Sequence, residues 1–206
     1  RNVCLLAEYH RKIIATTTAI NYSNEVVWIS MVLVDKEYRG HGISKLLLDK
    51  ILGKLSSCRS IKLDATPEGQ RVYTGFDFKD EYPIKRMTID SIDSSSLIEG
   101  HGLVQPIQSE DIQNIVAFDK LSFGADRKEL LESLISTCPH RAWMIKQNNA
   151  VAGFVLGRSG RKYNQIGPLM ALDTHLAKVL IIKMLKESEN TPLVVDVLND
   201  KVDLMR

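Results

Sequence analysis

Short apolar runs, separated by polar turns, dominate the first third of the chain. Residues 3–9 and 13–21 are rich in β-favouring residues and flank the polar segment 10–12 (HRK), a pattern that predicts a β-hairpin. Residues 25–34 (EVVWISMVLV) form a nearly continuous apolar run, which is typical of a strand buried on both faces. We therefore expect three strands before the first helix.

The hydrophobic period changes at Gly42. Apolar positions then recur every three or four residues as far as Leu55, which predicts an amphipathic helix with its apolar stripe facing inward. Residues 60–65 (SIKLDA) predict a further strand, 66–76 a short helix and 82–89 another strand. Residues 90–102 (DSIDSSSLIEGHG) lack periodicity and are rich in Ser, Asp and Gly, which predicts a linker, with a long surface loop inside one domain as the alternative.

The second half of the chain repeats this alternation. Ser109 is expected at a helix N-cap, with Glu110 and Asp111 in the first turn. The predicted helices cover residues 112–121, 127–136 and 176–187, and the predicted strands cover 103–107, 141–146, 150–157, 164–171 and 193–198.

The two halves resemble a duplication. Pairing Ala15 with Gly153 gives an offset of 138 (153 − 15), whereas pairing Asp64 with Asp196 gives 132 (196 − 64). The second copy has therefore lost about six residues, which we place opposite residues 35–41 of the first copy. The first half has no counterpart of the helices at 112–136 and the second half stops after its Asp196 strand, so each copy looks incomplete in this chain.

Composition narrows the class of protein. The 206 residues are 44% hydrophobic and 25% charged, an ordinary globular composition. The net charge of +2 does not favour a nucleic-acid partner, and no apolar run is long enough for a membrane span. Cys4, Cys58 and Cys138 lie far apart, without metal-ligand spacing, and the chain does not begin like a signal peptide. We expect a cytoplasmic protein without a bound metal.

Residues 32–44 carry the most informative chemistry. A buried strand enters a turn that contains Gly40 and Gly42 and then opens a helix. The first amides of a helix lack partners inside the helix, and glycines let the backbone approach a phosphate closely. Arg39 adds a permanent cation, so this segment predicts a pyrophosphate cradle. Its spacing matches neither the Walker loop nor the Rossmann fingerprint.

Arg39-Gly40-His41-Gly42-Ile43-Ser44 resembles the Arg/Gln-x-x-Gly-x-Gly/Ala motif of the GNAT acetyltransferases. The similarity extends from about residue 3 to residue 87, and the whole chain is similar to tandem GNAT proteins with a motif-bearing first copy and a degenerate second copy. Two residues depart from the family pattern. Ser44 replaces the last small residue of the motif, and Asp77 replaces the glycine usually found before Phe78, which puts the shape of the Tyr73 turn in doubt.

The resemblance implies an α/β fold with a mixed, centrally splayed sheet and helices on both faces, present as domains 1–89 and 103–206. It also implies acetyl-CoA as the acyl donor and an amine as the acceptor, a small molecule before a protein. The residues expected to bind acetyl-CoA are Val32, Leu33 and Val34 for the pantetheine arm, and Arg39, Gly40, His41, Gly42, Ile43 and Ser44 for the pyrophosphate. An amide near Val32 would stabilise the oxyanion, and Tyr73 would protonate the leaving thiolate.

Several assignments keep an alternative. Tyr73 could be a core residue with a solvated hydroxyl, and His41 is expected to face solvent rather than act in catalysis. Asp64 and Glu25 are candidate general bases, although Asp64 could simply cap the turn that follows it. Trp28 is expected to be core or a pocket wall.

The second copy is not expected to bind CoA. It lacks the loop glycines and the arginine, and it carries Asp173 where a phosphate would lie. Covering the first site, shaping the acceptor pocket and forming a homodimer are open roles for it. The alternative function for the whole chain is a non-catalytic CoA-sensing or scaffolding module, and a nucleotide-binding domain of another class is a more distant one.

Overall fold

The computed structural model describes residues 2–91, 103–188 and 191–205. Its contacts divide the chain into two compact units, the first built on Arg1–Lys79 with Gly124–Asp126 and the second on Asp80–Phe123 with Arg127–Arg206. Most of the predicted linker, residues 92–102, lies outside the described residues. Each unit is described by itself below.

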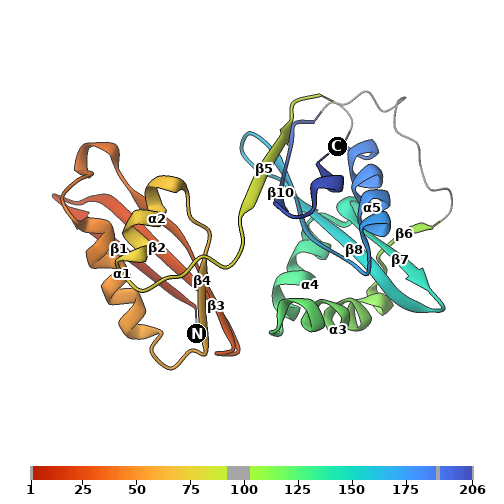
Figure 1. Cartoon of the computed structure of the whole chain (residues 1–206), viewed down its shortest axis with the longest axis horizontal. Coiled ribbons are helices and arrows are strands. Elements are labelled where there is room, and N and C mark those ends of the chain that lie inside the picture. The colour runs from red at the N-terminus through yellow and green to blue at the C-terminus, as the bar shows by residue number, and fades with distance from the viewer. Residues whose placement is uncertain (1, 92–102, 189–190, 206) are drawn as a thin grey trace. The chain divides into compact units, whose positions relative to one another are not determined.

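The first unit is a four-stranded sheet in the order β1-β2-β3-β4 (Figure 1). The strands are β1 (Val3–Tyr9), β2 (Lys12–Tyr22), β3 (Val26–Val34) and β4 (Ser60–Leu63). The first three strands are antiparallel and β4 runs parallel to β3. The predicted hairpin is confirmed, and its turn contains two left-handed residues, His10 (φ 49°) and Arg11 (φ 64°).

Helices cover one face of this sheet. They are α1 (Ile43–Lys54) and α2 (Pro67–Thr74) (Figure 1), and a short 3-10 turn, Lys36–Tyr38, lies between β3 and α1. The core beneath them consists of Ala19, Val27, Ile29, Leu48, Ile51 and Leu55, with α2 and its following turn packed alongside through Val72, Tyr73, Phe76 and Phe78. The predicted helix at 43–55 is therefore confirmed with its stripe facing inward.

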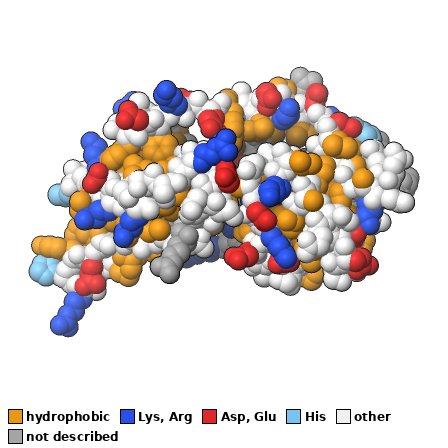
Figure 2. Space-filling view, turned by 90° about the horizontal axis from the view of Figure 1, so that it is seen from below, with side chains coloured by type: hydrophobic (Ala, Val, Ile, Leu, Met, Phe, Trp, Pro, Cys, Tyr) orange, Lys and Arg blue, Asp and Glu red, His pale blue; other side chains and the backbone are white. Residues whose placement is uncertain are grey.

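The expectation that residues 25–34 are buried on both faces was wrong for the second half of that strand. Met31 is 57% exposed and Leu33 is 55% exposed, whereas Val27 and Ile29 are buried. The described residues place no helix on the face opposite α1, so side chains there remain accessible. Figure 2 shows hydrophobic side chains on the surface of the protein among scattered charges of both signs.

The second unit is a six-stranded sheet in the order β5-β10-β9-β8-β7-β6. Its strands are β5 (Ile84–Ile89), β6 (Val104–Pro106), β7 (Ala142–Gln147), β8 (Ala150–Arg158), β9 (Asn164–Ala171) and β10 (Leu193–Leu198). Its helices are α3 (Ile112–Phe123), α4 (Lys128–Thr137) and α5 (Thr174–Lys186). Short 3-10 turns cover Ser109–Asp111, Pro139–Arg141 and Val202–Leu204.

Both faces of the second sheet are covered. Helices α3 and α4 pack on one face over Met144, Phe154 and Leu156, and α5 packs on the other face over Ile145 and Val155 (Figure 1). The predicted N-cap at Ser109 was wrong. The cap is Gln108, whose side chain and that of Asp111 bond reciprocally to backbone amides in a capping box.

Strand β5 precedes the predicted linker in sequence but belongs to the second sheet. It pairs antiparallel with β10 from Ile84 opposite Leu198 to Ile89 opposite Leu193 (Figure 1). Arg86 on β5 forms an ion pair with Asp196 on β10, with donor–acceptor distances of 2.8 and 2.7 Å. The first domain predicted from the sequence ends at residue 89 and the first unit ends at Lys79, so the two boundaries differ by ten residues (89 − 79 = 10), which include β5.

The register of the strands supports the duplication. Ala15 pairs with Val34 in the first sheet, and Gly153 pairs with Ala171 in the second. Eight residues, 35–42, then precede α1, whereas two residues, 172–173, precede α5, so the second copy is six residues shorter at this point (8 − 2 = 6).

No helix of the described residues is both long and apolar enough to cross a membrane.

Candidate functional site

Strands β3 and β4 part in the middle of the first sheet. Their parallel pairing runs from Val26 opposite Ser60 to Ile29 opposite Leu63 and then stops. Beyond this point, no described strand pairs with the β4-side edge of residues 30–34. The backbone amides and carbonyls on this edge are therefore open to an extended ligand. The binding of a pantetheine arm by Val32, Leu33 and Val34 stays a prediction.

A β-bulge lies at the point where the strands part. Thr16 pairs with Leu33 and Thr18 pairs with Ser30, so two residues of β3 oppose the single residue Thr17. Met31 in the bulge has φ 53°, which is a strained conformation for a residue with a Cβ. The Thr16 hydroxyl donates to the Met31 carbonyl at 2.8 Å and so helps to hold the bulge in place.

The end of β3 leads into a glycine turn and then into α1. Gly40 (φ 81°) and Gly42 (φ 75°) both adopt the left-handed conformation that glycine tolerates best. Gly42 is the N-cap of α1, so no side chain caps the helix, and its first turn contains no acidic residue. The amides of the first turn are thus free of intrahelical partners, and the helix dipole makes this end favourable for an anion.

Arg39 and His41 lie within this turn. Arg39 donates from Nε to the Val34 carbonyl at 3.2 Å, which brings the guanidinium back over the end of β3. His41 is exposed, as predicted, and its Nδ1 lies 3.0 Å from the Arg39 carbonyl oxygen.

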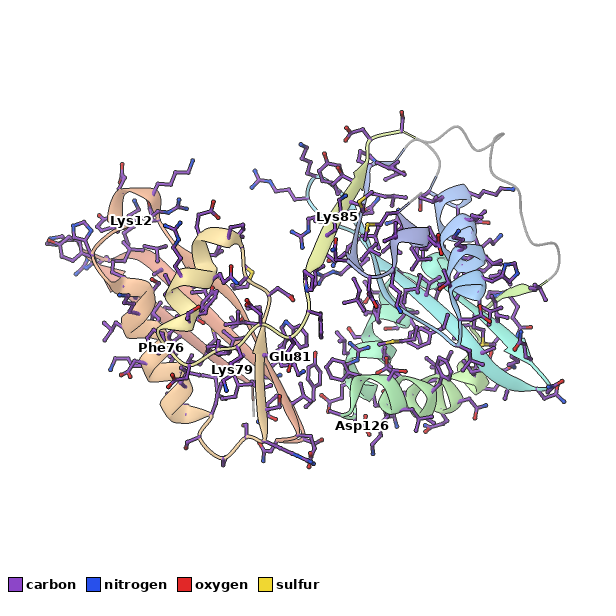
Figure 3. All side chains as sticks on the ribbon, in the orientation of Figure 1. Lys12, Phe76, Lys79, Glu81, Lys85 and Asp126 are labelled. Carbon is purple, nitrogen blue, oxygen red and sulfur yellow. The ribbon has the colours of Figure 1, made fainter. Side chains whose placement is uncertain are left out.

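Lys12 anchors the segment that enters the turn (Figure 3). Its ammonium lies 2.8 Å from Asp35 and 3.5 Å from Glu37. The hydrogen bond with Lys12 lowers the pKa of Asp35, and the same bond raises the pKa of Lys12. Asp35 also accepts from the Glu37 amide at 3.2 Å, so one carboxylate fixes both the turn and its attachment to β2.

Tyr73 lies on α2 and is half-buried against the core of the first unit. Its ring meets that of Phe78 edge-on, with centroids 6.1 Å apart. Burial raises the pKa of the Tyr73 phenol above its ordinary value, so the hydroxyl holds its proton at neutral pH. This is the protonation state that a general acid requires.

The turn after α2 keeps its shape although it lacks the usual glycine. Asp77 itself takes the left-handed conformation, with φ 62°, and the Phe78 amide donates to the Tyr73 carbonyl at 3.3 Å. Aspartate tolerates this conformation better than most residues but less well than glycine. The turn therefore forms without the glycine, and the replacement by Asp77 affects its strain energy and not its shape.

We expect Asp77→Gly to stabilise the first unit by about 0.5–1 kcal/mol, because glycine removes the strain of a Cβ at positive φ. Asp77→Ala is the matched control and is expected to destabilise it by about 1 kcal/mol, since alanine keeps the Cβ and loses the polar side chain. Urea unfolding followed by Trp28 fluorescence in a Trp143→Phe background measures both. The same sign for the two variants would contradict this account.

The two candidate bases occupy different environments. Asp64 follows β4 and its carboxylate accepts from the Trp28 indole at 3.2 Å. Thr66, not Asp64, caps α2 by accepting from the Gly69 amide at 3.2 Å. Glu25 forms an exposed ion pair with Arg59 at 3.1 Å, at the start of β3 and away from the bulge in the strand. Asp64 is therefore the better placed of the two.

Tyr73 and Asp64 lie on opposite faces of the sheet where β3 and β4 part. Tyr73 packs with the residues beneath α1. Trp28 alternates along β3 with Val27 and Ile29, which face α1, so Trp28 and the carboxylate that it holds lie on the other face. The Trp28–Asp64 bond and the Thr16–Met31 bond were missed in the sequence, because both depend on strand register.

The second copy also has parted strands, but its helix α5 is capped by a side chain. Strands β9 and β10 pair only from Asn164 opposite Leu193 to Ile166 opposite Val195. Asp173, however, caps α5 by accepting from the Leu176 amide at 2.8 Å. One amide of the first turn is thereby occupied, and a negative charge stands at the helix end.

Comparison with known proteins finds a GNAT domain in each half of the chain. The sequence matches two models described as acetyltransferase (GNAT) domains, one over residues 1–87 and the other over residues 115–206. The uncharacterized N-acetyltransferase YitH of Bacillus subtilis is 24% identical over 176 residues, which are 85% of this chain and 62% of that protein. The holothin acyltransferase of a Pseudoalteromonas species is 24% identical over 184 residues, which are 89% of this chain and 61% of that protein. The chain thus spans about three fifths of the length of these curated relatives.

Solved structures show the same fold. A Pyrococcus horikoshii protein considered an acetyltransferase is 26% identical, with a TM-score of 0.74 over 98% of this chain and 66% of that one. A tandem GNAT protein from the clavulanic acid biosynthesis pathway is 9% identical, with a TM-score of 0.64 over 97% of this chain and 75% of that one.

Proposed function

Because this chain belongs to the GNAT acetyltransferase family and carries two copies of its domain in tandem, we propose that its first copy binds acetyl-CoA at Arg39–Ser44 and transfers the acetyl group to an amine. The family supports acyl transfer in general. The donor, the amine acceptor and the residues that act on them are the content of the proposal.

The observation that carries the proposal is the uncapped start of α1 beside the parted strands. Gly40 and Gly42 shape a turn whose amides have no side-chain competitor, and Arg39 adds positive charge at its edge. These features suit the pyrophosphate of acetyl-CoA. The chain from Val32 to the start of the turn spans at most about 25 Å, since an extended residue spans about 3.3 Å. The open edge of β3 at Val32–Val34 therefore lies close enough to the turn to suit the pantetheine arm of the same ligand.

Two side chains, Asp64 and Tyr73, account for the proton transfers that the proposed reaction requires. The acceptor arrives as an ammonium ion and gives one proton to Asp64, which passes it to water. Its nitrogen then attacks the thioester carbonyl, and an amide of the bulge at residues 31–32 stabilises the oxyanion. As the C–S bond breaks, Tyr73 gives its proton to the thiolate and recovers one from the nitrogen. The products are the acetylated amine and CoA.

The second copy is proposed to bind no CoA. The carboxylate of Asp173 already accepts from the amide that a phosphate would use, and it would repel the phosphate as well. The described residues that precede α5 contain neither a glycine pair nor an arginine comparable to those before α1.

Titration calorimetry with acetyl-CoA tests the donor site. We expect one site per chain in the wild type and about thirtyfold weaker binding in the combined variant Arg39→Ala, Gly42→Asp, which removes a cation, strains the turn and adds a carboxylate at the helix N-terminus.

Gly53→Asp is the matched control. Gly53 is an exposed residue of the same helix, without positive φ and with open space around its Cβ position, so a carboxylate there leaves the turn unchanged. Equal weakening by this variant, or two sites per chain, would contradict the proposal. Tight binding without release of CoA in the presence of a panel of amines would favour the non-catalytic alternative.

A further inference from the structure

The carboxylate of Asp64 has an uncommon partner. It accepts a hydrogen bond from the Trp28 indole Nε1, with a donor–acceptor distance of 3.2 Å. Among the described residues no cation forms an ion pair with it, and the residue is exposed. One oxygen of a charged group is therefore held in place while the other faces solvent, at the point where β3 and β4 part.

The second copy contains the equivalent carboxylate in a different state. Ile29 pairs with Leu63 in the first sheet and Ile166 pairs with Val195 in the second, and an aspartate follows each, Asp64 and Asp196. Asp196, however, is held by two nitrogens of Arg86 on strand β5. A bidentate pair with a guanidinium occupies both carboxylate oxygens and balances the charge.

The same strand equivalence shows that the position of Trp28 is occupied by a different residue in the second copy. Trp28 precedes Ile29 on β3, and Gln165 precedes Ile166 on β9. Gln165 accepts from Arg158 and supplies no donor to Asp196. The same fold thus carries one aspartate that is neutralised and one that is positioned with its charge uncompensated.

We propose that Trp28 is a specificity-determining residue of the first copy, because its indole N–H positions the Asp64 carboxylate so that the acceptor subsite selects a cation over a neutral molecule. The inference rests on the function proposed above for the first copy. Asp64 binds the ammonium through its free oxygen and takes one proton from it. Trp28 is a positioning residue that fixes the carboxylate through its N–H.

Neutral acceptors do not fit this arrangement. A hydroxyl or an amide would gain one hydrogen bond from Asp64 but would leave the carboxylate charge unbalanced, whereas an ammonium ion balances it. The subsite therefore predicts discrimination by charge rather than by shape.

The two tryptophans of the chain make a direct test possible. In a ¹⁵N–¹H spectrum the indole N–H groups of Trp28 and Trp143 give two signals, and they lie in different copies. Titration with butylammonium chloride, without acetyl-CoA, is expected to move the Trp28 signal saturably and to leave the Trp143 signal in place. Butanol, a neutral analogue, is expected to move neither.

Two variants separate the roles. Asp64→Asn keeps an oxygen for the indole N–H but removes the charge, and it is expected to abolish the saturable shift. Trp28→Phe keeps a ring but removes the donor, and with the protein labelled at its aspartate carboxyl carbons, the Asp64 signal is expected to require about fivefold more butylammonium. The Asp196 signal, assigned with Asp196→Asn, is the internal control and should not respond.

Three results would overturn the proposal: no saturable shift in the wild type, an equal response of Asp64 and Asp196, or a Trp28→Phe titration identical to that of the wild type. Calorimetry with acetyl-CoA is measured on the same samples. Loss of acetyl-CoA binding contradicts the donor site, and loss of the ammonium response contradicts the acceptor subsite, so the two failures are distinguishable.

Discussion

Replacement of Tyr73 by phenylalanine is expected to lower kcat by about 10²–10⁴-fold, the usual contribution of a positioned general acid. Phenylalanine keeps the ring that packs against Phe78 and the core of the first unit, and it removes only the hydroxyl. The KM for acetyl-CoA should stay unchanged, because the lost interaction acts as the C–S bond breaks.

The pH dependence follows from the burial of Tyr73. Burial raises the pKa of this phenol above its ordinary value of 10.0, so the hydroxyl remains protonated at neutral pH. The acid form is present below that folded-state pKa and is lost as the pH rises through it. For the wild type we therefore expect the loss of kcat that comes from this group to begin at a higher pH than an unburied tyrosine would give.

Release of CoA in the presence of an amine acceptor, at saturating acetyl-CoA, measures this effect. Tyr82→Phe is the matched control, because Tyr82 is an exposed tyrosine outside the first unit. If Tyr73→Phe keeps kcat within twofold of the wild type, Tyr73 is a packing residue and another group protonates the thiolate.

Replacement of Arg127 by methionine is expected to destabilise the second unit by about 3–5 kcal/mol, the cost of leaving a buried charge without its partner. Asp119 on α3 is fully buried, and its two carboxylate oxygens accept from Arg127 at 2.8 and 2.5 Å. The Arg127 guanidinium also stacks 3.9 Å from the centre of the Phe123 ring. The pair thus ties the end of α3 to the start of α4.

Urea unfolding followed by Trp143 fluorescence, in a Trp28→Phe background, reports on the second unit. Glu132→Gln is the control, since Glu132 and Lys128 form an exposed pair at 3.7 Å whose loss should cost only a few tenths of a kcal/mol. A double replacement, Asp119→Leu with Arg127→Met, is expected to recover much of the loss, because no charge is then left buried. A loss below about 1 kcal/mol in Arg127→Met would contradict the importance of this pair.

The local hydrophobic pattern predicted most helices and strands of the fold. It could not predict which strands pair when they lie far apart in the sequence. The apolar stripe of α1 and the presence and end of β5 depend on adjacent residues, so the sequence predicted them, although it placed the start of β5 at residue 82 instead of Ile84. The partner of β5 could not, because Arg86 meets Asp196 across 110 positions and nothing near residue 86 marks which sheet the strand joins.

The candidate site likewise has features that local sequence predicted and features that depend on long-range pairing. The Arg39–Ser44 turn was predictable, since Gly40 and Gly42 record in their identity the left-handed backbone that the turn requires. Asp64 was recognised as a candidate, but its partner Trp28 depends on the register between two strands separated by a helix. The left-handed Met31 could not be foreseen, because methionine has no preference for that conformation.

The placement of β5 bears on how such a protein can change during evolution. The segment matched to the first domain model ends at residue 87 and supplies the first four residues of the strand that pairs with β10, among them the arginine that neutralises Asp196. Deleting the first copy at the boundary suggested by its family match would strip the surviving copy of an edge strand and expose the backbone of β10. The second copy therefore depends on a segment that precedes it in the chain, and removal of the whole first match is expected to destabilise it.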